Sequence, residues 1–352
     1  MDDFDESSKP LIKEDSGIPD DIITVPDFSS APQSVSNGDR DEINEKRYDL
    51  NRMDDISEMV RTRDESLIKN NVRDHIKEII SKNRCLDDFN CLFMLDEVNS
   101  LSRVHAERIY AAIQEFDENK NIVLFLRSPG GSAEAAYLIS QLCNRFKKEK
   151  FIVSIPAEAK SAATLLSFGA DEIHMGPMSE LGPIDIQVNG LPLLSVSSAL
   201  TKIASIVQEY PRSASMFAEY LTNNLNIGLI GHYDRVTESA TQYAQMLLDG
   251  KNDENARSIE EIAHHFTNHY KDHGFVIDVK ESKNILGSKM VKDDTDIYSV
   301  GSKILAFINH VEFSCLLSGV RTNIVVIGSG CEMLVDSTNN DEVLLRGVRG
   351  MC

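Results

Sequence analysis

The amino-acid sequence predicts an α/β domain built around a parallel sheet. Two short runs of consecutive apolar residues, 91–95 and 121–126, are typical of strands that are buried on both faces. Between these runs, and again after the second, apolar residues recur at helical spacing. Strands that alternate with helices in this way indicate βαβ units, in which successive strands lie parallel in one sheet.

The further elements follow in the same rhythm. Val104, Ile109, Ala112 and Ile113 predict a helix after the first strand. The later elements expected are a helix over 133–148, a strand over 151–155, a short helix after Ser161, a strand over 172–175, and a mostly helical stretch over 192–272. Because this last stretch contains no second βαβ series, we interpret it as a helical extension of the same domain.

The ends of the chain differ in composition from its centre. Residues 1–50 contain 14 Asp and Glu against five Lys and Arg, and four of the ten prolines. Such a segment buries too little apolar surface to offset its ordering entropy, so we expect a disordered acidic arm over 1–52. A leading helix is predicted over 53–88, the main domain over 89–315, and a C-terminal extension over 316–352.

Composition also predicts which partners the protein binds and in which cellular compartment it resides. The formal net charge is -20, with 56 Asp and Glu against 36 Lys and Arg, which argues against nucleic-acid binding. We expect no secretory signal and no membrane span, since neither a charged start before an apolar run nor about 20 consecutive apolar residues is visible. Six scattered cysteines without a CxxC pair favour reduced thiols in the cytoplasm.

Two adjacent glycines mark the first candidate functional segment. Gly130 and Gly131 follow a predicted strand and precede a predicted helix, within the sequence Ser128-Pro129-Gly130-Gly131. Glycines at such a turn let backbone N–H groups approach a ligand closely, as an oxyanion hole requires. Taken alone, the same pattern also fits a tight turn or a phosphate-binding loop.

The second candidate is a serine between the next strand and helix. Ser161 stands at a predicted helix start, where the N–H of Ala162 and the helix dipole can stabilise a developing oxyanion. Small neighbours leave room for a substrate to approach. The alternative is that Ser161 only caps the helix, because serine is a preferred N-cap residue.

A third segment supplies a carboxylate. Asp185 follows Gly182 and Pro183 on a predicted rigid loop, where it is suited to orienting a histidine or positioning a substrate. An aspartate at such a position is also commonly a solvated turn residue.

Taken together, consecutive blocks of the chain resemble the serine dehydrogenase proteinase family, which is related to the Clp protease and signal peptide peptidase A enzymes. These blocks are the residues 128–136, 159–164, 170–177 and 179–185, and a shorter block at 271–274 in which Asp272 replaces the usual serine. The resemblance covers roughly 90–315 and implies a Clp/crotonase-like fold with a repeated ββα core, and an oligomer. It implies no organic cofactor. No GxGxxG fingerprint accompanies the strands, so dehydrogenase activity is not expected.

The resemblance also implies roles for individual residues. Ser161 would be the nucleophile, and Gly130 or Gly131 with Ala162 would donate the oxyanion-hole N–H groups. A serine hydroxyl needs a base. His273 is the first candidate because imidazole titrates near neutrality; Lys202 is the second, since signal peptide peptidase-like relatives use a Ser–Lys dyad. We rank Lys160 third and expect a substrate or structural role for it.

The spacing of three histidines, taken alone, indicates a different chemistry, namely metal binding. His265, His269 and His273 stand at i, i+4 and i+8, and on a helix they would share a face able to hold a metal ion. The glutamate of the HExxH pattern is missing, so we predict no metal site.

The sequence therefore predicts a serine hydrolase, most readily a serine peptidase that acts on a peptide or protein through an acyl-Ser161 intermediate. The rival hypothesis is a catalytically silent scaffold that keeps the fold and binds partners through its acidic arm and helical extension.

Overall fold

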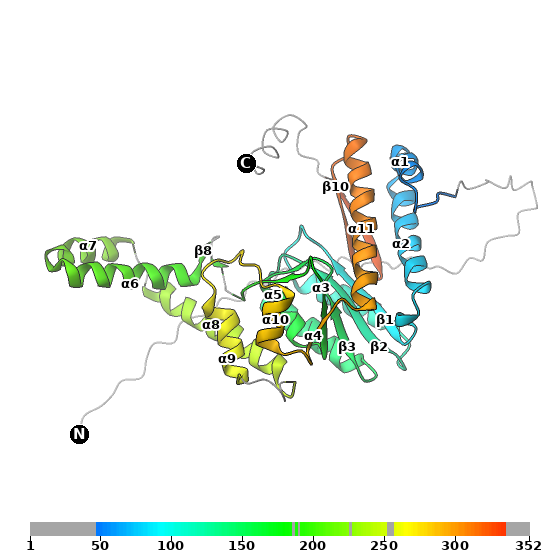
Figure 1. Ribbon diagram of the computed structural model, residues 1–352. Helices are drawn as coiled ribbons and strands as arrows, with labels where there is room; N and C mark the ends of the chain where they lie inside the picture. The colour runs from blue at the N-terminus through cyan, green and yellow to red at the C-terminus, as the bar shows by residue number, and fades with distance from the viewer. Residues whose placement is uncertain (1–46, 185–186, 189–190, 225–226, 252–256, 336–352) are drawn as a thin grey trace, which may run out of the picture. The chain divides into compact units, whose positions relative to one another are not determined.

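The structure is a computed structural model that describes residues 47–184, 187–188, 191–224, 227–251 and 257–335. The predicted acidic arm lies outside these residues except for 47–52. The described chain is an α/β structure with a mixed sheet, in agreement with the expected fold class (Figure 1).

Seven of the described strands form the main sheet, in the order β11-β10-β1-β2-β3-β5-β9. Five neighbouring strands run parallel to one another, namely β1, β2, β3, β5 and β9. Strand β10 is antiparallel to both β1 and β11. Their bounds are β1 Phe89–Leu95, β2 Asn121–Arg127, β3 Phe151–Ser154, β5 Glu172–Met175, β9 Val291–Asp293, β10 Thr322–Gly328 and β11 Gly330–Val335. Two small sheets are formed by β4 Glu158–Ala159 with β6 Glu180–Leu181, and by β7 Gln187–Val188 with β8 Leu191–Pro192.

Helices connect and cover the strands. Those of the main domain are α1 Met53–Arg61, α2 Glu65–Ser81, α3 Arg103–Ile113, α4 Ala133–Phe146, α5 Ala162–Phe168, α10 Val279–Leu286 and α11 Asp296–Leu317. The helical extension consists of α6 Leu193–Glu209, α7 Ala214–Asn224, α8 Ile227–Leu248, α9 Ile259–His264 and the π-helix η3 His265–His269. Two short 3-10 helices are η1 Arg84–Leu86 and η2 Pro211–Ser213.

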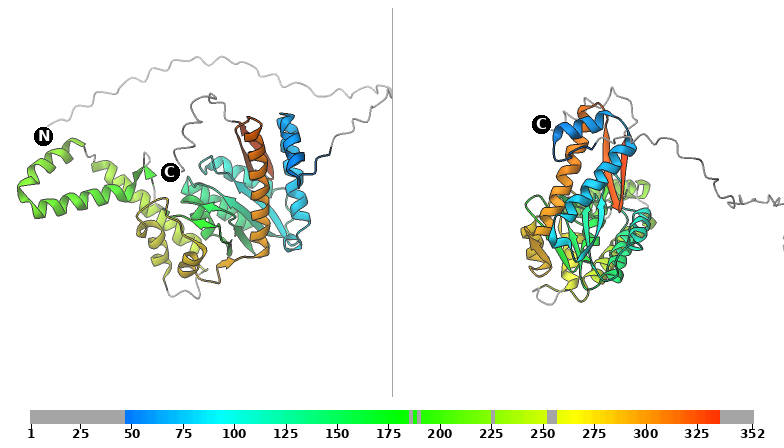
Figure 2. Two further views of the ribbon diagram at one scale, coloured as in Figure 1. Left: turned by 45° about the horizontal axis from the view of Figure 1, so that its top comes forward. Right: turned by 90° about the vertical axis from the view of Figure 1, so that its right-hand side faces the viewer.

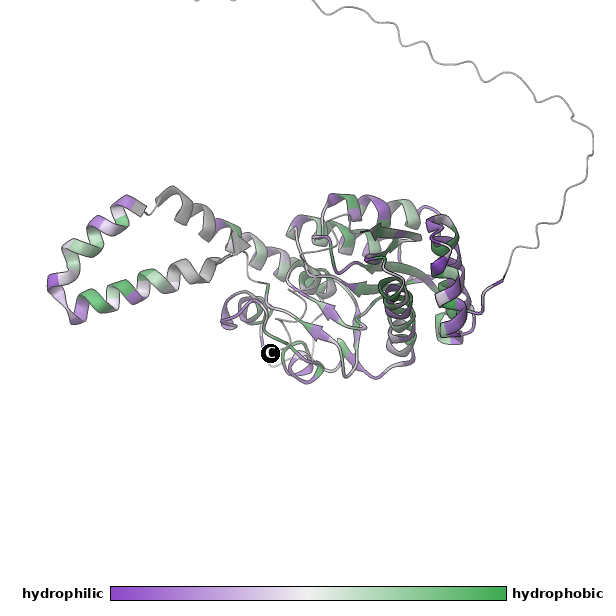
Figure 3. Cartoon of the chain, turned by 90° about the horizontal axis from the view of Figure 1, so that it is seen from above, coloured by the Kyte–Doolittle hydropathy of each residue, from purple (hydrophilic) through white to green (hydrophobic). Residues whose placement is uncertain are grey.

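The sheet separates two apolar cores because side chains alternate across each strand. In β1, Leu92 and Met94 face the core that is shared with α3, α4 and α5. Phe93 and Leu95 face the opposite core, which α1, α2 and α11 cover. The two sets of helices lie on opposite sides of the strands in Figure 2, and Figure 3 shows much of the strands in green, the colour of hydrophobic residues.

Two boundaries differ from the sequence-based expectation. The predicted leading helix over 53–88 is two helices, because the chain turns at Arg63, whose φ is 56°, and Asp64 caps α2 by accepting a hydrogen bond from the N–H of Leu67. The predicted C-terminal extension begins at 316, yet β10 pairs with β1 inside the main sheet. The sheet therefore continues past the expected end of the domain.

Within the part of the chain that the structure describes, one helix, α11, is long and apolar enough to cross a membrane by length and composition. Our sequence criterion required consecutive apolar residues and so overlooked it. Half of its most apolar window is buried, and Ile304, Phe307 and Val311 pack in the core beneath α1 and α2. This packing is typical of the core helix of a domain, and the absence of a membrane span stays a prediction.

Candidate active site

Backbone pairing brings the glycine turn and Ser161 together at the carboxyl edge of the sheet. The N–H of Ser128, just after β2, donates to the carbonyl of Glu158, and the N–H of Lys160 donates to the carbonyl of Ser128. Both N···O distances are 3.0 Å. The turn after β2 and the turn after β4 are thus fixed to each other by main-chain hydrogen bonds, as in a short parallel ladder.

Ser161 occupies the N-cap position of α5 in a strained backbone conformation. Its φ is 48° and its ψ is −116°, a region that few residues other than glycine adopt. The Ser161 side chain makes no capping hydrogen bond. The alternative reading of Ser161 as a helix-capping serine therefore does not hold, because the hydroxyl is not used in the way a cap requires. Strain at a single functional residue is typical of active sites.

Gly130 packs directly against the serine. Its φ is 99°, and a Cβ atom built on it would lie 2.8 Å from the Cβ of Ser161 and 2.6 Å from the carbonyl oxygen of Lys160. Any larger residue would push the two turns apart. Glycine at this position is therefore required both by the backbone conformation and by the close approach of the Ser161 turn.

The two turns line one cavity of about 330 Å³. Ser161, Ala162, Gly130, Gly131 and His273 all contribute to its wall. The structure thus gathers the proposed nucleophile, the first candidate base and all three proposed oxyanion-hole residues around a single space. Ala133 and Ile184, from two of the family-like blocks, also line it, as do Ser100 and Ala240, which carried no motif that sequence reasoning could use.

The segment that contains His273 is anchored to the Ser161 side of the domain. Ile277 and Leu181 form an antiparallel bridge, with N···O distances of 2.9 and 3.1 Å. A tight turn precedes it, in which the N–H of Gly274 donates to the Asp272 carboxylate at 2.7 Å. His273 reaches the cavity because this bridge holds its loop against β6.

Lys160, the third-ranked candidate base, is engaged in contacts with neighbouring segments. Its ammonium group pairs with Glu180 at 3.1 Å. It also lies 3.5 Å from the carbonyl oxygens of Leu181 and Phe275. Lys160 therefore links the serine turn to both sides of the bridge that anchors the His273 loop.

The other candidate residues have different positions. Lys202 is exposed on α6 and is not among the described residues that line the Ser161 cavity. Asp185 lies outside the described residues, so the structure gives no position for its carboxylate.

The three regularly spaced histidines do not share a helix face. His265 and His269 belong to the π-helix η3, where their rings stack with centroids 4.1 Å apart, and they line a different cavity from the one that holds Ser161. The chain leaves helical conformation at Tyr270, and His273 lies beyond it, at the Ser161 cavity. A shared face would have required one continuous helix from His265 to His273, which the structure does not have.

An arginine that sequence reasoning missed joins the strands beneath the cavity. Arg127, the last residue of β2, donates to the carboxylate of Glu158 at 2.8 Å and also pairs with Glu97. The three side chains come from segments next to β1, β2 and β4. Arg127 carried no signal of this role, because an arginine before a Ser-Pro-Gly-Gly turn is also what a solvated strand end would show.

Comparison with known proteins gives one family match. The family model described as ClpP-like SDH-type serine proteinase matches residues 100–300. The matched stretch contains the glycine turn, Ser161 and His273.

Three curated proteins are similar over shorter stretches. A membrane-bound protease of Pyrococcus horikoshii is 30% identical over 128 residues, which is 34% of this chain and 29% of that protein. Two uncharacterized proteins of Methanocaldococcus jannaschii are 36% and 33% identical, each over 27% of this chain and about a third of their own length. The chain thus spans about a third of the curated relatives it matches.

Three solved structures that match part of the chain share little sequence with it. A serine-to-alanine mutant of the 1510-N membrane-bound stomatin-specific protease has a TM-score of 0.36 and 16% identity, over 63% of this chain and 84% of that one. A lysine-to-alanine mutant of the same protease, in complex with a substrate peptide, has a TM-score of 0.35 and 17% identity, over 58% and 74%. ClpP1 from Listeria monocytogenes has a TM-score of 0.36 and 16% identity, over 59% and 94%.

Proposed function

Because the chain belongs to the ClpP-like SDH-type serine proteinase family, we propose that it hydrolyses peptide bonds through an acyl-Ser161 intermediate. The single observation that carries the proposal is the cavity of about 330 Å³ around which Ser161, Ala162, Gly130, Gly131 and His273 meet. A scaffold without catalysis would not need a strained serine whose hydroxyl is left uncapped beside a glycine turn.

The chemistry begins with attack by the Ser161 hydroxyl oxygen on the carbonyl carbon of the scissile peptide. His273 accepts the hydroxyl proton as the new carbon–oxygen bond forms, and the carbonyl oxygen takes up the negative charge. Backbone N–H groups of Ala162 and Gly131 donate to that oxyanion, because the N–H of Gly130 already donates to the Ser128 hydroxyl oxygen at 3.2 Å. The observation that supports this role is the close contact of Gly130 with the Ser161 turn, which places the glycine turn beside the attacking serine.

Breakdown of the intermediate uses the same groups in reverse order. His273 returns the proton to the leaving amine as the carbon–nitrogen bond breaks, which leaves an ester on Ser161. His273 then deprotonates a water molecule, the resulting hydroxide attacks the ester carbonyl, and the Ser161 oxygen leaves and regains its proton. Acylation and deacylation each pass through an oxyanion intermediate. The same preorganised donors therefore stabilise the transition states of both half-reactions.

The wall of the cavity supports an uncharged side chain next to the scissile bond. Apart from His273, its described wall consists of Gly, Ala, Ser, Pro and Ile residues. Because the described part of this wall has no Asp, Glu, Lys or Arg, a charged side chain placed there would lose its hydration without compensation. We therefore propose that the substrate presents a small or apolar residue here, and we take an unstructured peptide with such residues as the first assay substrate.

The identity of the base is tested by comparing His273→Ala with Lys202→Ala. We expect His273→Ala to lower kcat by at least about 10³-fold, while Lys202→Ala retains kcat within about 2-fold, because Lys202 is exposed on α6. Both assays use the full chain and the same peptide. Loss of turnover in Lys202→Ala alone would instead assign a Ser–Lys dyad, and undiminished turnover in both variants would remove the mechanism.

A further inference from the structure

A buried side-chain pair closes the loop over 96–102, which lies between β1 and α3. Asp96 is 1% exposed and His105 is 6% exposed, and the His105 Nε2 atom lies 3.3 Å from the Asp96 Oδ2 atom. Neither residue lines the Ser161 cavity within the part of the chain that the structure describes. Burying a carboxylate and an imidazole costs free energy unless both are hydrogen-bonded, so their partners indicate what the pair does.

Asp96 organises the start of this loop. Its Oδ1 atom accepts from the N–H groups of Val98 at 3.0 Å and Asn99 at 2.8 Å. Its Oδ2 atom accepts from the Asn99 side-chain amide at 2.9 Å as well as from His105. Four donors hold one carboxylate, and although burial opposes ionisation, these hydrogen bonds leave the pKa of Asp96 below its usual value.

His105 fastens the other end of the loop. Its Nδ1 atom lies 3.2 Å from the backbone nitrogen of Ser102 and 3.1 Å from the Ser102 hydroxyl oxygen, at the start of α3. A backbone N–H can only donate, so Nδ1 is the acceptor and the ring proton resides on Nε2, where it donates to Asp96. One neutral imidazole therefore ties the first residue of the loop to its last.

Leu101, close to the end of the loop, contacts the glycine turn. The N–H of Leu101 donates to the carbonyl of Gly130 at 2.7 Å, and the N–H of Ser132 donates to the carbonyl of Leu101 at 2.8 Å. A Cβ atom on Gly131 would lie 2.4 Å from both the nitrogen and the oxygen of Leu101. The backbone of Leu101 thus fixes the positions of both glycines through contacts separate from those of Ser161.

We propose that Asp96 and His105 are positioning residues for the Ser161 site, which they serve by clamping the loop that fixes Gly130 and Gly131. The inference rests on the proposed function, because its consequence for rate exists only if these glycines face an oxyanion. Displacing a catalytic donor by about 1 Å can reduce a rate by about 10²-fold. A clamp outside the cavity then controls kcat without touching the substrate.

The test is the full chain with Asp96→Asn. The asparagine NH2 group would face the Nε2–H of His105, so a donor meets a donor and the clamp loses its hydrogen bond. We expect kcat on the peptide substrate to fall by about 10–100-fold with KM changed by less than about 3-fold. Amide hydrogen exchange at Leu101 and Ser132 should become faster in the same variant.

The matched control is Glu172→Gln, which breaks another carboxylate–histidine pair. Glu172 contacts the buried His174 at 3.0 Å, at the opposite edge of the sheet from Ser161. This control should lose stability and keep kcat within about 2-fold. Should Asp96→Asn not fold, His105→Gln repeats the test, because it can still donate to Asp96 but offers no ring acceptor to Ser102.

The two hypotheses fail in distinguishable ways. Unchanged exchange at Leu101 and Ser132 in Asp96→Asn would overturn the clamp. Faster exchange with undiminished kcat would overturn the positioning role, as would an equal loss of kcat in the Glu172→Gln control. A wild-type chain that neither cleaves peptide nor reacts with a fluorophosphonate would instead overturn the proposed function, and the exchange rates would still decide whether the clamp exists.

Discussion

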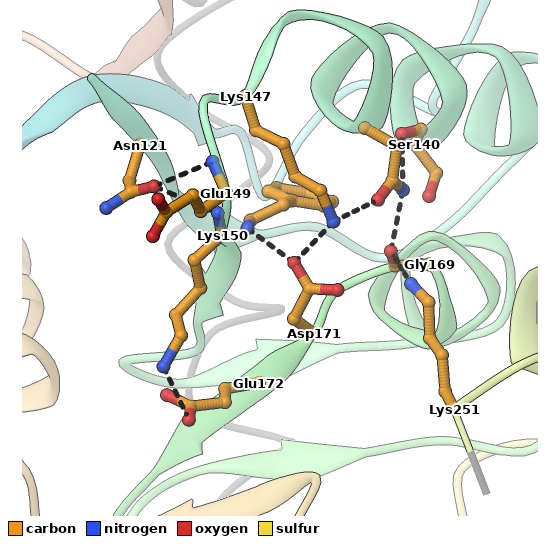
Figure 4. Close-up of polar contacts among 11 residues, drawn as sticks. Asn121, Ser140, Lys147, Glu149, Lys150, Gly169, Asp171, Glu172 and Lys251 are labelled. Atoms are coloured by element: carbon orange, nitrogen blue, oxygen red, sulfur yellow. Dashed lines mark hydrogen bonds and ion pairs between the residues drawn. The ribbon is translucent and has the colours of Figure 1, made fainter. Parts of the chain in front are cut away.

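The two edges of the central sheet are built by different means. At the carboxyl edge, the Ser161 cavity is shaped by main-chain hydrogen bonds and by residues with positive φ, Gly130, Gly131 and Ser161. At the amino edge, where β2, β3 and β5 begin, side chains connect the segments through the ion pairs and hydrogen bonds that Figure 4 shows. The two regions join the same strands, β2 and β3, at opposite ends.

At the amino edge, polar groups form hydrogen bonds and ion pairs with one another. The Asp171 carboxylate accepts from the Lys147 ammonium at 2.6 Å and from the N–H of Phe151 at 2.7 Å. The Asn121 side chain accepts from the N–H groups of Glu149 and Lys150, at 3.1 and 2.9 Å (Figure 4). Each of these contacts closes a loop onto the start of a strand and leaves the polar atoms paired.

The difference teaches where stability and activity reside. Groups that satisfy one another lower the free energy of the folded state, so their loss should reduce stability. A serine held in a strained conformation with an uncapped hydroxyl contributes little to stability and keeps its oxygen available. Substitutions at the two edges should therefore separate the two properties.

The largest expected effect is that of Ser161→Ala on turnover. We expect kcat to fall by at least about 10³-fold, because the attacking oxygen is removed. The Tm should change by less than about 2 °C, since the lost hydroxyl makes no capping bond. Thermal unfolding and peptide hydrolysis measured on one preparation check both statements, and wild-type turnover in this variant would refute the nucleophile.

Ser161→Gly sharpens the same contrast. Glycine adopts a φ of 48° without the strain that a Cβ atom imposes, so this variant should be as inactive as Ser161→Ala but more stable by about 1 kcal/mol. Denaturant unfolding of both variants measures the difference. Equal stability would mean that the conformation of Ser161 stores no strain.

Gly130→Ala should damage activity and stability together. The added Cβ atom would meet the Lys160 carbonyl oxygen at 2.6 Å and the Ser161 Cβ at 2.8 Å, so the two turns must separate. We expect kcat to fall by about 10²-fold and the free energy of unfolding to fall by about 1–3 kcal/mol. Retention of kcat would show that the glycine turn does not face the reacting atoms.

Asp171→Asn tests the amino edge. It removes the charge that binds Lys147 and weakens the hydrogen bond to the N–H of Phe151. The free energy of unfolding should fall by about 1–3 kcal/mol, with kcat unchanged within about 2-fold. A loss of kcat larger than the loss of folded protein would show that the two edges are coupled.

The smallest expected effect is a pH dependence at the same edge. The hydrogen bond from His174, followed by that from Lys150, lowers the pKa of Glu172 from 4.5 to about 2 despite its burial. Because the folded pKa is the lower one, Glu172 stabilises the fold above about pH 4.5, and this contribution is lost as the pH falls toward about 2. Glu172→Gln should therefore be less stable than wild type at pH 7, with a difference that shrinks between pH 4.5 and 2.

The local sequence pattern was enough to predict those elements whose structure depends mainly on residues nearby in the sequence. The apolar runs that became β1 and β2 had to be buried on both faces, and the glycine turn and Ser161 follow directly from the strand-to-helix positions they occupy. These features formed where they were predicted because short-range geometry determines them.

The remaining features depend on contacts between distant segments. The run 324–327 was visible as apolar, but its antiparallel pairing with β1 joins residues from opposite ends of the domain. Ala240 reaches the cavity from α8, and the Asp96 clamp needs His105 one helical turn into α3. A single alanine or histidine in an amphipathic helix has the same local pattern whether or not it faces a site, so no signal of this kind could have identified them.

The most direct test of the central claim is labelling of the wild-type chain with a fluorophosphonate probe, read by mass spectrometry of its peptides. The reaction needs both an activated hydroxyl and a working oxyanion hole, which is what the carboxyl edge is proposed to supply. We expect one probe per chain, located on Ser161, with no labelling of Ser161→Ala and slower labelling of Gly130→Ala. Labelling at another serine, or none in a chain that is folded by thermal unfolding, would contradict the account.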